Sequence, residues 1–260
     1  MSRRRKVYGK CHICGIVGKL TFEHIPPRSA FNDHPTVLYR VFDLLNVGPD
    51  DEVKSKGQPM PKGMGGYTLC PRCNNNTGAW YGKAFADWCR QGFQLLSKAG
   101  GKPTLYYPFW IFPLRVLKQI ITMFFSVNNP DFAERNSELV SFVLNPKRKY
   151  INLEKYRIFV YLNPEGRWAR IGGFQGKLNF LTKTIYIFSE IKFPPFGYVM
   201  TIDNYSPPDL RLYDITYFSR YDYNEFRDVY LKLPLLPTYS WFPGDYRTKK
   251  EIIQQREEHL

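Results

Sequence analysis

Four of the five cysteines fall into two pairs with the spacing of metal ligands. Cys11 and Cys14 form one C-x-x-C turn, and Cys70 and Cys73 form the second. Zinc prefers four ligands at tetrahedral angles, and two such turns supply four thiolates. A complete thiolate shell leaves no open position, so the sequence predicts a structural zinc ion that contributes to folding. The fifth cysteine, Cys89, lies in a helical pattern and is expected to be a small buried residue.

A second group of reactive residues lies between the cysteine pairs. Glu23 and His24 directly precede Ile25-Pro26-Pro27. Neighbouring side chains of a strand point to opposite faces, but at a strand end broken by proline the two can converge on one site. Imidazole titrates near neutral pH and suits a general base, whereas a carboxylate with an amide oxygen suits magnesium or manganese. These are the groups that phosphodiester hydrolysis requires. The alternative is a zinc-ribbon binding module in which His24 only packs or hydrogen-bonds.

Taken together, the motifs resemble the HNH (ββα-metal) endonuclease superfamily. The similar branch is the zinc-containing one that includes the phage Holliday-junction resolvases. The resemblance spans about residues 8–98 and is carried by three motifs in order. They are Cys11-x-x-Cys14, then Glu23-His24-Ile25-Pro26, then Leu69-Cys70-x-x-Cys73-Asn74 with Gly78 four residues later.

The resemblance implies a role for each matching position. His24 would be the general base, Glu23 and Asn74 would bind a catalytic Mg²⁺ or Mn²⁺, and the four cysteines would hold the structural Zn²⁺. The helix after Asn74 would be the α element, and the two strands before it the β-hairpin. The implied activity is hydrolysis of DNA phosphodiester bonds.

Some features depart from the usual pattern of this superfamily. Glu23 replaces the more usual aspartate, and Asn74 stands where a histidine is often found, which favours magnesium or manganese over zinc. Because Asn75 and Asn76 follow at once, the ligand can shift by one or more positions. The polar segment 31–66 is longer than a minimal unit requires and is expected to read substrate or contact a partner.

Other polar residues near these motifs are weaker candidates. Arg28, Arg72, Lys83 and Arg90 are expected to neutralise DNA phosphates, the alternative being ordinary surface charge. His34 is a further candidate for the metal site. His12 and His259 are expected to lie on the surface.

The elements that would position these residues define an α+β fold. The chain divides near Gly100–Pro103 into residues 1–100, a zinc-stabilised ββα-metal (HNH/treble-clef-like) domain, and residues 101–260, an α+β domain for recognition, dimerisation or docking. In the first part, strands are expected at 19–22 and 66–69, some helix near 37–45, and a helix over 80–95. In the second, helices are expected at 114–127, 132–144 and 249–260, and antiparallel strands at 156–162, 168–174, 184–191, 198–202 and 212–218.

The amino-acid composition limits the kinds of partner that the protein is expected to bind and its expected location. A net charge of +14 with pI near 9.5 favours a polyanionic partner, which by charge alone can be nucleic acid, an anionic membrane or an acidic protein. The resemblance implies that this partner is DNA. An odd cysteine count and a basic N-terminus with no apolar signal region argue against a secreted disulfide scaffold, so a cytoplasmic location without membrane contact is expected. The resulting hypothesis is a metal-dependent HNH endonuclease, in anti-phage defence or restriction, acting as a homodimer or in a larger complex. Its rivals are a non-catalytic zinc module that binds nucleic acid and an interaction subunit.

Overall fold

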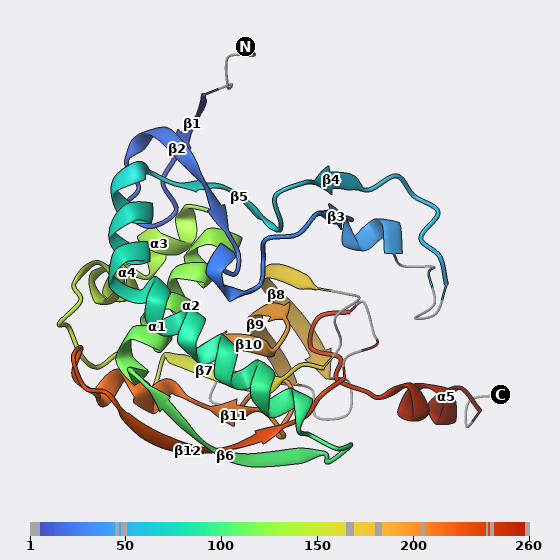
Figure 1. Cartoon of the computed structure of the whole chain (residues 1–260). Coiled ribbons are helices and arrows are strands. Elements are labelled where there is room, and N and C mark those ends of the chain that lie inside the picture. The colour runs from blue at the N-terminus through green and yellow to red at the C-terminus, as the bar shows by residue number, and fades with distance from the viewer. Residues whose placement is uncertain are drawn as a thin grey trace.

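The computed structural model describes residues 6–44, 47, 51–164, 169–179, 184–203, 206–237, 239 and 242–257. The expectation for His259, and the ends of the elements expected at 37–45, 168–174 and 249–260, lie outside these ranges. The described part is a mixed α+β structure with antiparallel sheets (Figure 1). Within it, no helix combines the length and apolar character needed to cross a bilayer.

A three-stranded sheet and a long helix make up the first part of the fold. The strands are β1 (Val7–Lys10), β2 (Val17–His24) and β5 (Gly65–Leu69), in the order β1-β2-β5. The chain passes from β5 directly into α1 (Pro71–Ser97), which begins earlier than the periodicity indicated because Pro71 occupies its first turn. This part therefore contains an antiparallel β2–β5 pair followed by a helix.

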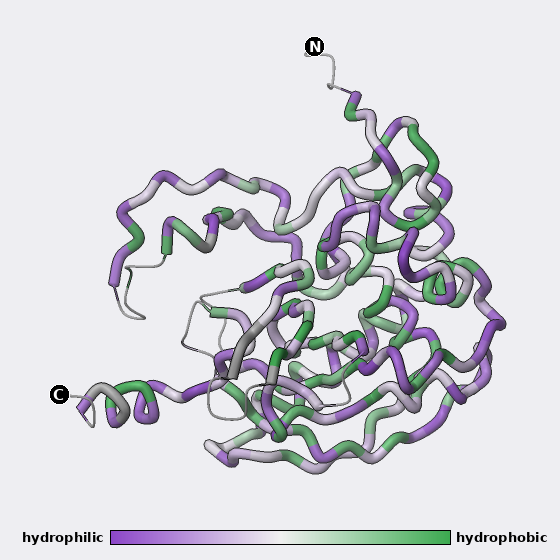
Figure 2. The backbone as a smooth tube through the Cα atoms, turned by 180° about the vertical axis from the view of Figure 1, so that it is seen from behind, coloured by the Kyte–Doolittle hydropathy of each residue, from purple (hydrophilic) through white to green (hydrophobic). Residues whose placement is uncertain are grey.

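The segment between β2 and β5 forms an arm that projects from the body (Figure 1). It carries η1 (Arg28–Ala30), β3 (Thr36–Leu38), η2 (Val41–Leu44) and β4 (Gln58–Met60). β3 pairs with β4, so the helix expected near 37–45 is replaced by a strand and a short 3₁₀ turn. Seen from behind, polar residues follow much of this arm (Figure 2).

The second part is built on a five-stranded antiparallel sheet in the order β11-β7-β10-β9-β8. Its strands are β7 (Tyr156–Leu162), β8 (Arg170–Asn179), β9 (Thr184–Phe193), β10 (Phe196–Ile202) and β11 (Tyr213–Asp214). Successive side chains of a strand face opposite sides, and β7 is apolar on both. Ile158 and Val160 join the main core, whereas Phe159 and Tyr161 join a smaller core on the other face.

Helices cover the main-core face of this sheet. They are α2 (Pro113–Val127), α3 (Asp131–Arg135) and α4 (Ser137–Leu144), while α5 (Lys249–Glu257) projects from the body (Figure 1). Nearly every side chain of α2 is buried. The single helix expected at 132–144 is interrupted at Asn136, whose side-chain amide donates to the carbonyl oxygen of Phe132.

The structure differs from the expected strands in two places. The strand expected at 212–218 is only partly present: β11 covers Tyr213–Asp214, and a 3₁₀ helix, η3 (Thr216–Arg220), follows. The strand ends because Asp214 Oδ1 accepts from the backbone N–H and the hydroxyl of Thr216 and turns the chain. A two-stranded sheet of β6 (Thr104–Ile111) and β12 (Arg227–Pro234) was not predicted. Its strands lie more than a hundred residues apart, so no local signal indicates their pairing.

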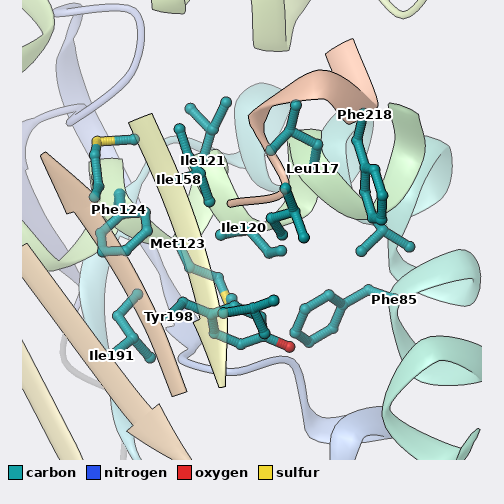
Figure 3. Packing of buried hydrophobic residues seen from close by; sticks show 14 of the residues in the cluster. Phe85, Leu117, Ile120, Ile121, Met123, Phe124, Ile158, Ile191, Tyr198 and Phe218 are labelled. Atoms are coloured by element: carbon teal, nitrogen blue, oxygen red, sulfur yellow. The ribbon is translucent and has the colours of Figure 1, made fainter. Parts of the chain in front are cut away.

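One hydrophobic core joins residues on both sides of Gly100–Pro103. Phe85 of α1 lies near Tyr198 of β10 in a cluster with residues of α2, β7 and β9 (Figure 3). Trp88 stacks on Phe196 with ring centroids 4.4 Å apart and donates from Nε1 to the Tyr198 hydroxyl at 2.9 Å. The two predicted domains therefore pack on a common core.

Candidate functional site

The four cysteines of the two C-x-x-C turns converge. Their Sγ atoms all lie within 4.8 Å of one another, and those of Cys14 and Cys70 are 3.8 Å apart. None is in a disulfide, and Cys11 and Cys73 are buried. Four thiol sulfurs at this separation are able to bind a zinc ion. With all four positions supplied by protein, the ion would be structural.

Local backbone structure explains how each turn presents its thiols. After Cys14 the chain reverses at Gly15, where φ is +71° and the N–H donates to the Cys11 carbonyl oxygen at 2.9 Å. Cys70 is the N-cap of α1 and Cys73 lies in its first turn. The Cys73 thiol and the N–H of Cys70 lower the pKa of the Cys11 thiol below its ordinary value.

The cysteine cluster is braced by the second half of the chain. His12, within the first turn, donates from Nδ1 to the carbonyl oxygen of Phe125 on α2 at 3.3 Å. Lys10 forms an ion pair with Glu134 of α3. His12, which was expected on the surface, is half-buried.

A cavity of about 410 Å³ lies beside the cluster, between the end of β2 and α1. The described residues that line it include the three expected catalytic residues Glu23, His24 and Asn74, and the two basic residues Arg28 and Lys83. The other lining residues are Phe22, Pro27, Ser29, Gly78, Gly82 and Gln119. Residues from three separate stretches of sequence, 22–29, 74–83 and 119, thus meet around one hollow.

Glu23 contributes a buried carboxyl to this cavity. It pairs with Gly66 of β5, and the neighbouring Gly65 has no room for a side chain, because a Cβ there would lie 2.0 Å from the Glu23 carbonyl oxygen. Burial raises the pKa of Glu23 to about 8. A buried carboxylate is costly unless a positive charge compensates it. This position therefore favours either a proton or a bound cation.

The imidazole of His24 is half-buried and held from two sides. Its Nε2 lies 3.0 Å from the carbonyl oxygen of Lys62, and the ring contacts Phe22 edge-on at 5.0 Å. A carbonyl oxygen can only accept, so Nε2 carries the hydrogen of this bond. In the neutral ring the lone pair is then on Nδ1, which remains able to accept a proton.

Asn32, which sequence reasoning did not identify, fixes the segment that holds His24. It is fully buried, and its Nδ2 donates to the carbonyl oxygens of Pro26 and Met64 while its Oδ1 accepts from the Met64 N–H at 2.7 Å. Gly63 has φ +94°, and a Cβ there would lie 2.5 Å from Asn32 Oδ1. The only sequence signal was the position of Asn32 shortly after the Glu23–His24 pair.

Asn74 enters the cavity from the first turn of α1. Its Nδ2 donates to Thr21 Oγ1 at 3.0 Å and to the Phe22 carbonyl oxygen at 3.4 Å, and neither bond uses its amide oxygen. Asn75 and Asn76 are not among the described residues that line the cavity. Of the three consecutive asparagines, the one whose side-chain amide lines the cavity is therefore Asn74.

Of the basic residues and histidines expected near the site, some line the cavity and others do not. Arg28 and Lys83 are exposed and line the cavity, whereas Arg72 and Arg90 are exposed elsewhere on α1. Arg90 forms an ion pair with Asp87. His34 is exposed, 3.9 Å from Asp33, and is not among the described lining residues.

Comparison with known protein families, with curated proteins and with solved structures finds no match to this chain.

Proposed function

We propose that this protein is a metal-dependent endonuclease of the HNH (ββα-metal) type that hydrolyses DNA phosphodiester bonds. The proposal is supported by one observation above all. A histidine, a carboxyl and a side-chain amide line the same cavity beside a four-cysteine cluster, on an antiparallel strand pair followed by a helix.

The donors in the cavity suit a hard divalent cation. The Glu23 carboxylate and the Asn74 amide oxygen are the ligands we assign to Mg²⁺ or Mn²⁺, which prefer oxygen ligands. Glu23 fits this role because its burial leaves a negative charge that needs compensation. When bound, such a cation supplies charge neutralisation on the phosphate and on the leaving oxygen.

The side chains would then carry out the remaining steps. His24 accepts a proton from water at Nδ1 while Nε2 stays bonded to the Lys62 carbonyl, which keeps the ring oriented. The water oxygen forms a bond to phosphorus, and the phosphorus–oxygen bond to the adjoining nucleotide breaks. Arg28 and Lys83 hold the phosphate, since both are exposed at the cavity. One cavity cuts one strand, so duplex cleavage takes two chains or two binding events.

Nicking of supercoiled plasmid in Mg²⁺ or Mn²⁺ tests the proposal. Wild type is expected to nick, and His24→Ala should reduce the rate at least about 10²-fold, as loss of a general base does. His34→Ala is the matched control, because His34 is exposed and outside the described cavity lining. All three proteins should carry one zinc ion per chain and melt alike.

Three other results would contradict the proposal, and the last two of them identify the rival functions. A His24→Ala variant that cuts as fast as wild type means that His24 is not the base. DNA binding without cleavage in either metal indicates a non-catalytic zinc module. Absence of DNA binding at low salt indicates an interaction protein.

A further inference from the structure

Gln119 is a buried polar residue that the proposed mechanism does not yet use. It lies on α2, in the second half of the chain, and only 2% of its surface is exposed. Its Oε1 is one of the few buried side-chain oxygens of the described residues with no hydrogen-bond partner. Gln119 also lines the cavity that contains Glu23 and Asn74. A buried hydrogen-bond acceptor without a partner lowers the stability of a protein by about 1–3 kcal/mol. The unpaired Oε1 of Gln119 therefore needs an explanation.

The chemistry of an amide oxygen limits what can satisfy it. Oε1 has lone pairs and no hydrogen, so its partner must be a hydrogen-bond donor or a cation. A phosphodiester oxygen is itself an acceptor and cannot fill this role. Glu23 and Asn74 bring two further oxygens to the same cavity. The common partner of three such oxygens is a hard divalent cation.

We propose that Gln119 is a third protein ligand of the divalent cation in this cavity, binding through Oε1. The inference rests on the proposed function, because it concerns the same cation site. One carboxylate and two amides give the site a ligand charge of −1, so a bound dication keeps a net positive charge for the phosphate. An all-oxygen ligand set of this kind favours Mg²⁺ or Mn²⁺ over zinc.

The consequence concerns how the chain is organised. The site is incomplete without α2, so residues after Gly100 supply part of the metal-binding chemistry in addition to any role in recognition. The packing of α1 against α2 explains how this is achieved. Lys118, adjacent to Gln119, lies over the ring of Tyr81 on α1, which brings this part of α2 beside the Gly78–Gly82 turn.

Mn²⁺ binding to the zinc-loaded full-length protein, followed by electron paramagnetic resonance without DNA, tests the inference. Gln119→Met keeps the length of the side chain but removes the amide oxygen. It should raise the Kd for Mn²⁺ about 10-fold to 10²-fold. Gln119→Glu replaces the amide with a carboxylate and should lower the Kd. Thr122→Val is the control, because Thr122 is buried on the same helix and bonds to the Lys118 carbonyl oxygen instead of lining the cavity.

Glu23→Gln separates the inference from the proposal on which it rests. If wild type binds Mn²⁺ and Glu23→Gln loses it, while Gln119→Met binds as tightly as wild type, the Gln119 assignment is wrong and the cation site stands. If wild type binds no Mn²⁺, both the assignment and the proposed function are overturned. Should Gln119→Met fail to fold, the Gln119→Glu variant decides: an unchanged or higher Kd contradicts the inference.

Discussion

The imidazole of His24 and the carbonyl oxygen of Lys62 are joined by a hydrogen bond of 3.0 Å across the base of the arm. Because Lys62 contributes a backbone atom, no substitution of its side chain removes this bond. What holds the carbonyl in place is the neighbouring turn, where Asn32 bonds to both backbone groups of Met64. The orientation of His24 thus depends on a buried asparagine that does not itself line the cavity.

Asn32→Ala is predicted to destabilise the protein and to impair cleavage. The substitution removes the partner of the Met64 N–H and of the Pro26 carbonyl, at a cost of about 1–3 kcal/mol for each unsatisfied group, while the Met64 carbonyl keeps its bond from the Ile25 N–H. Urea denaturation measures the free energy of unfolding. The control is Gln58→Ala, an exposed change on the same arm. Equal stability of the two variants would show that Asn32 does not hold the turn.

Removing zinc is predicted to unfold the first part of the chain. Structural zinc contributes about 10–16 kcal/mol in zinc-finger peptides, so a strong chelator should abolish near-ultraviolet circular dichroism from this region. Cys14→Ser should lose the ion, because it removes one of the four converging thiols. Cys89→Ala should retain it, since Cys89 is buried on α1 and outside the cluster. A full zinc complement in Cys14→Ser would contradict the four-thiolate assignment.

Two glycines of α1, Gly78 and Gly82, are predicted to lower the stability of the protein while leaving room in the cavity for the phosphate. A Cβ added at Gly78 or Gly82 would meet nothing within 4 Å, yet glycine inside a helix costs about 1 kcal/mol relative to alanine. Both line the cavity. Gly78→Ala and Gly82→Ala should therefore each stabilise the protein by about 1 kcal/mol. Methyl groups on the cavity floor should also displace the phosphate and slow cleavage about 10-fold to 10²-fold.

Gly92 provides the contrasting case on the same helix. A Cβ there would lie 2.3 Å from the ring of Phe196, so Gly92→Ala should destabilise the protein by overpacking. Thermal melts and nicking rates of the three variants separate the effects. Stabilised Gly78→Ala and Gly82→Ala proteins that cut at the wild-type rate would mean that DNA does not approach this face of α1.

The salt dependence of DNA binding is predicted to identify the phosphate contacts. Arg28→Ala and Lys83→Ala should each reduce the slope of log Kd against log salt concentration by about 1, because each removes one phosphate contact at the cavity. Arg90→Ala is the control, because Arg90 lies outside the described lining residues and already pairs with Asp87. Fluorescence anisotropy with a labelled duplex gives the three slopes. An identical decrease in all three variants would indicate general surface charge instead of contacts at the cavity.

The sequence by itself determined the features that depend on neighbours along the chain. The spacing within Cys11–Cys14 and Cys70–Cys73 defines two short turns, and alternation and apolar runs predicted strand β7 at its observed bounds and helix α2 to within a residue. For these turns, strands and helices the physical signal is local. Glu23 and His24 were identified by residue type at a strand end broken by proline, whereas the role of Asn74 came only from the resemblance to the HNH superfamily.

Tertiary structure decided what depends on residues far apart in sequence. Only the packing of α2 against α1 brings Gln119 into the cavity, and only the return of the arm lets Asn32 bond Met64. The β6–β12 pair likewise has no local signature, because its register is set by the core beneath it. Contacts of this kind form when burial of apolar surface closes long loops, and neither residue type nor spacing records which segments will meet.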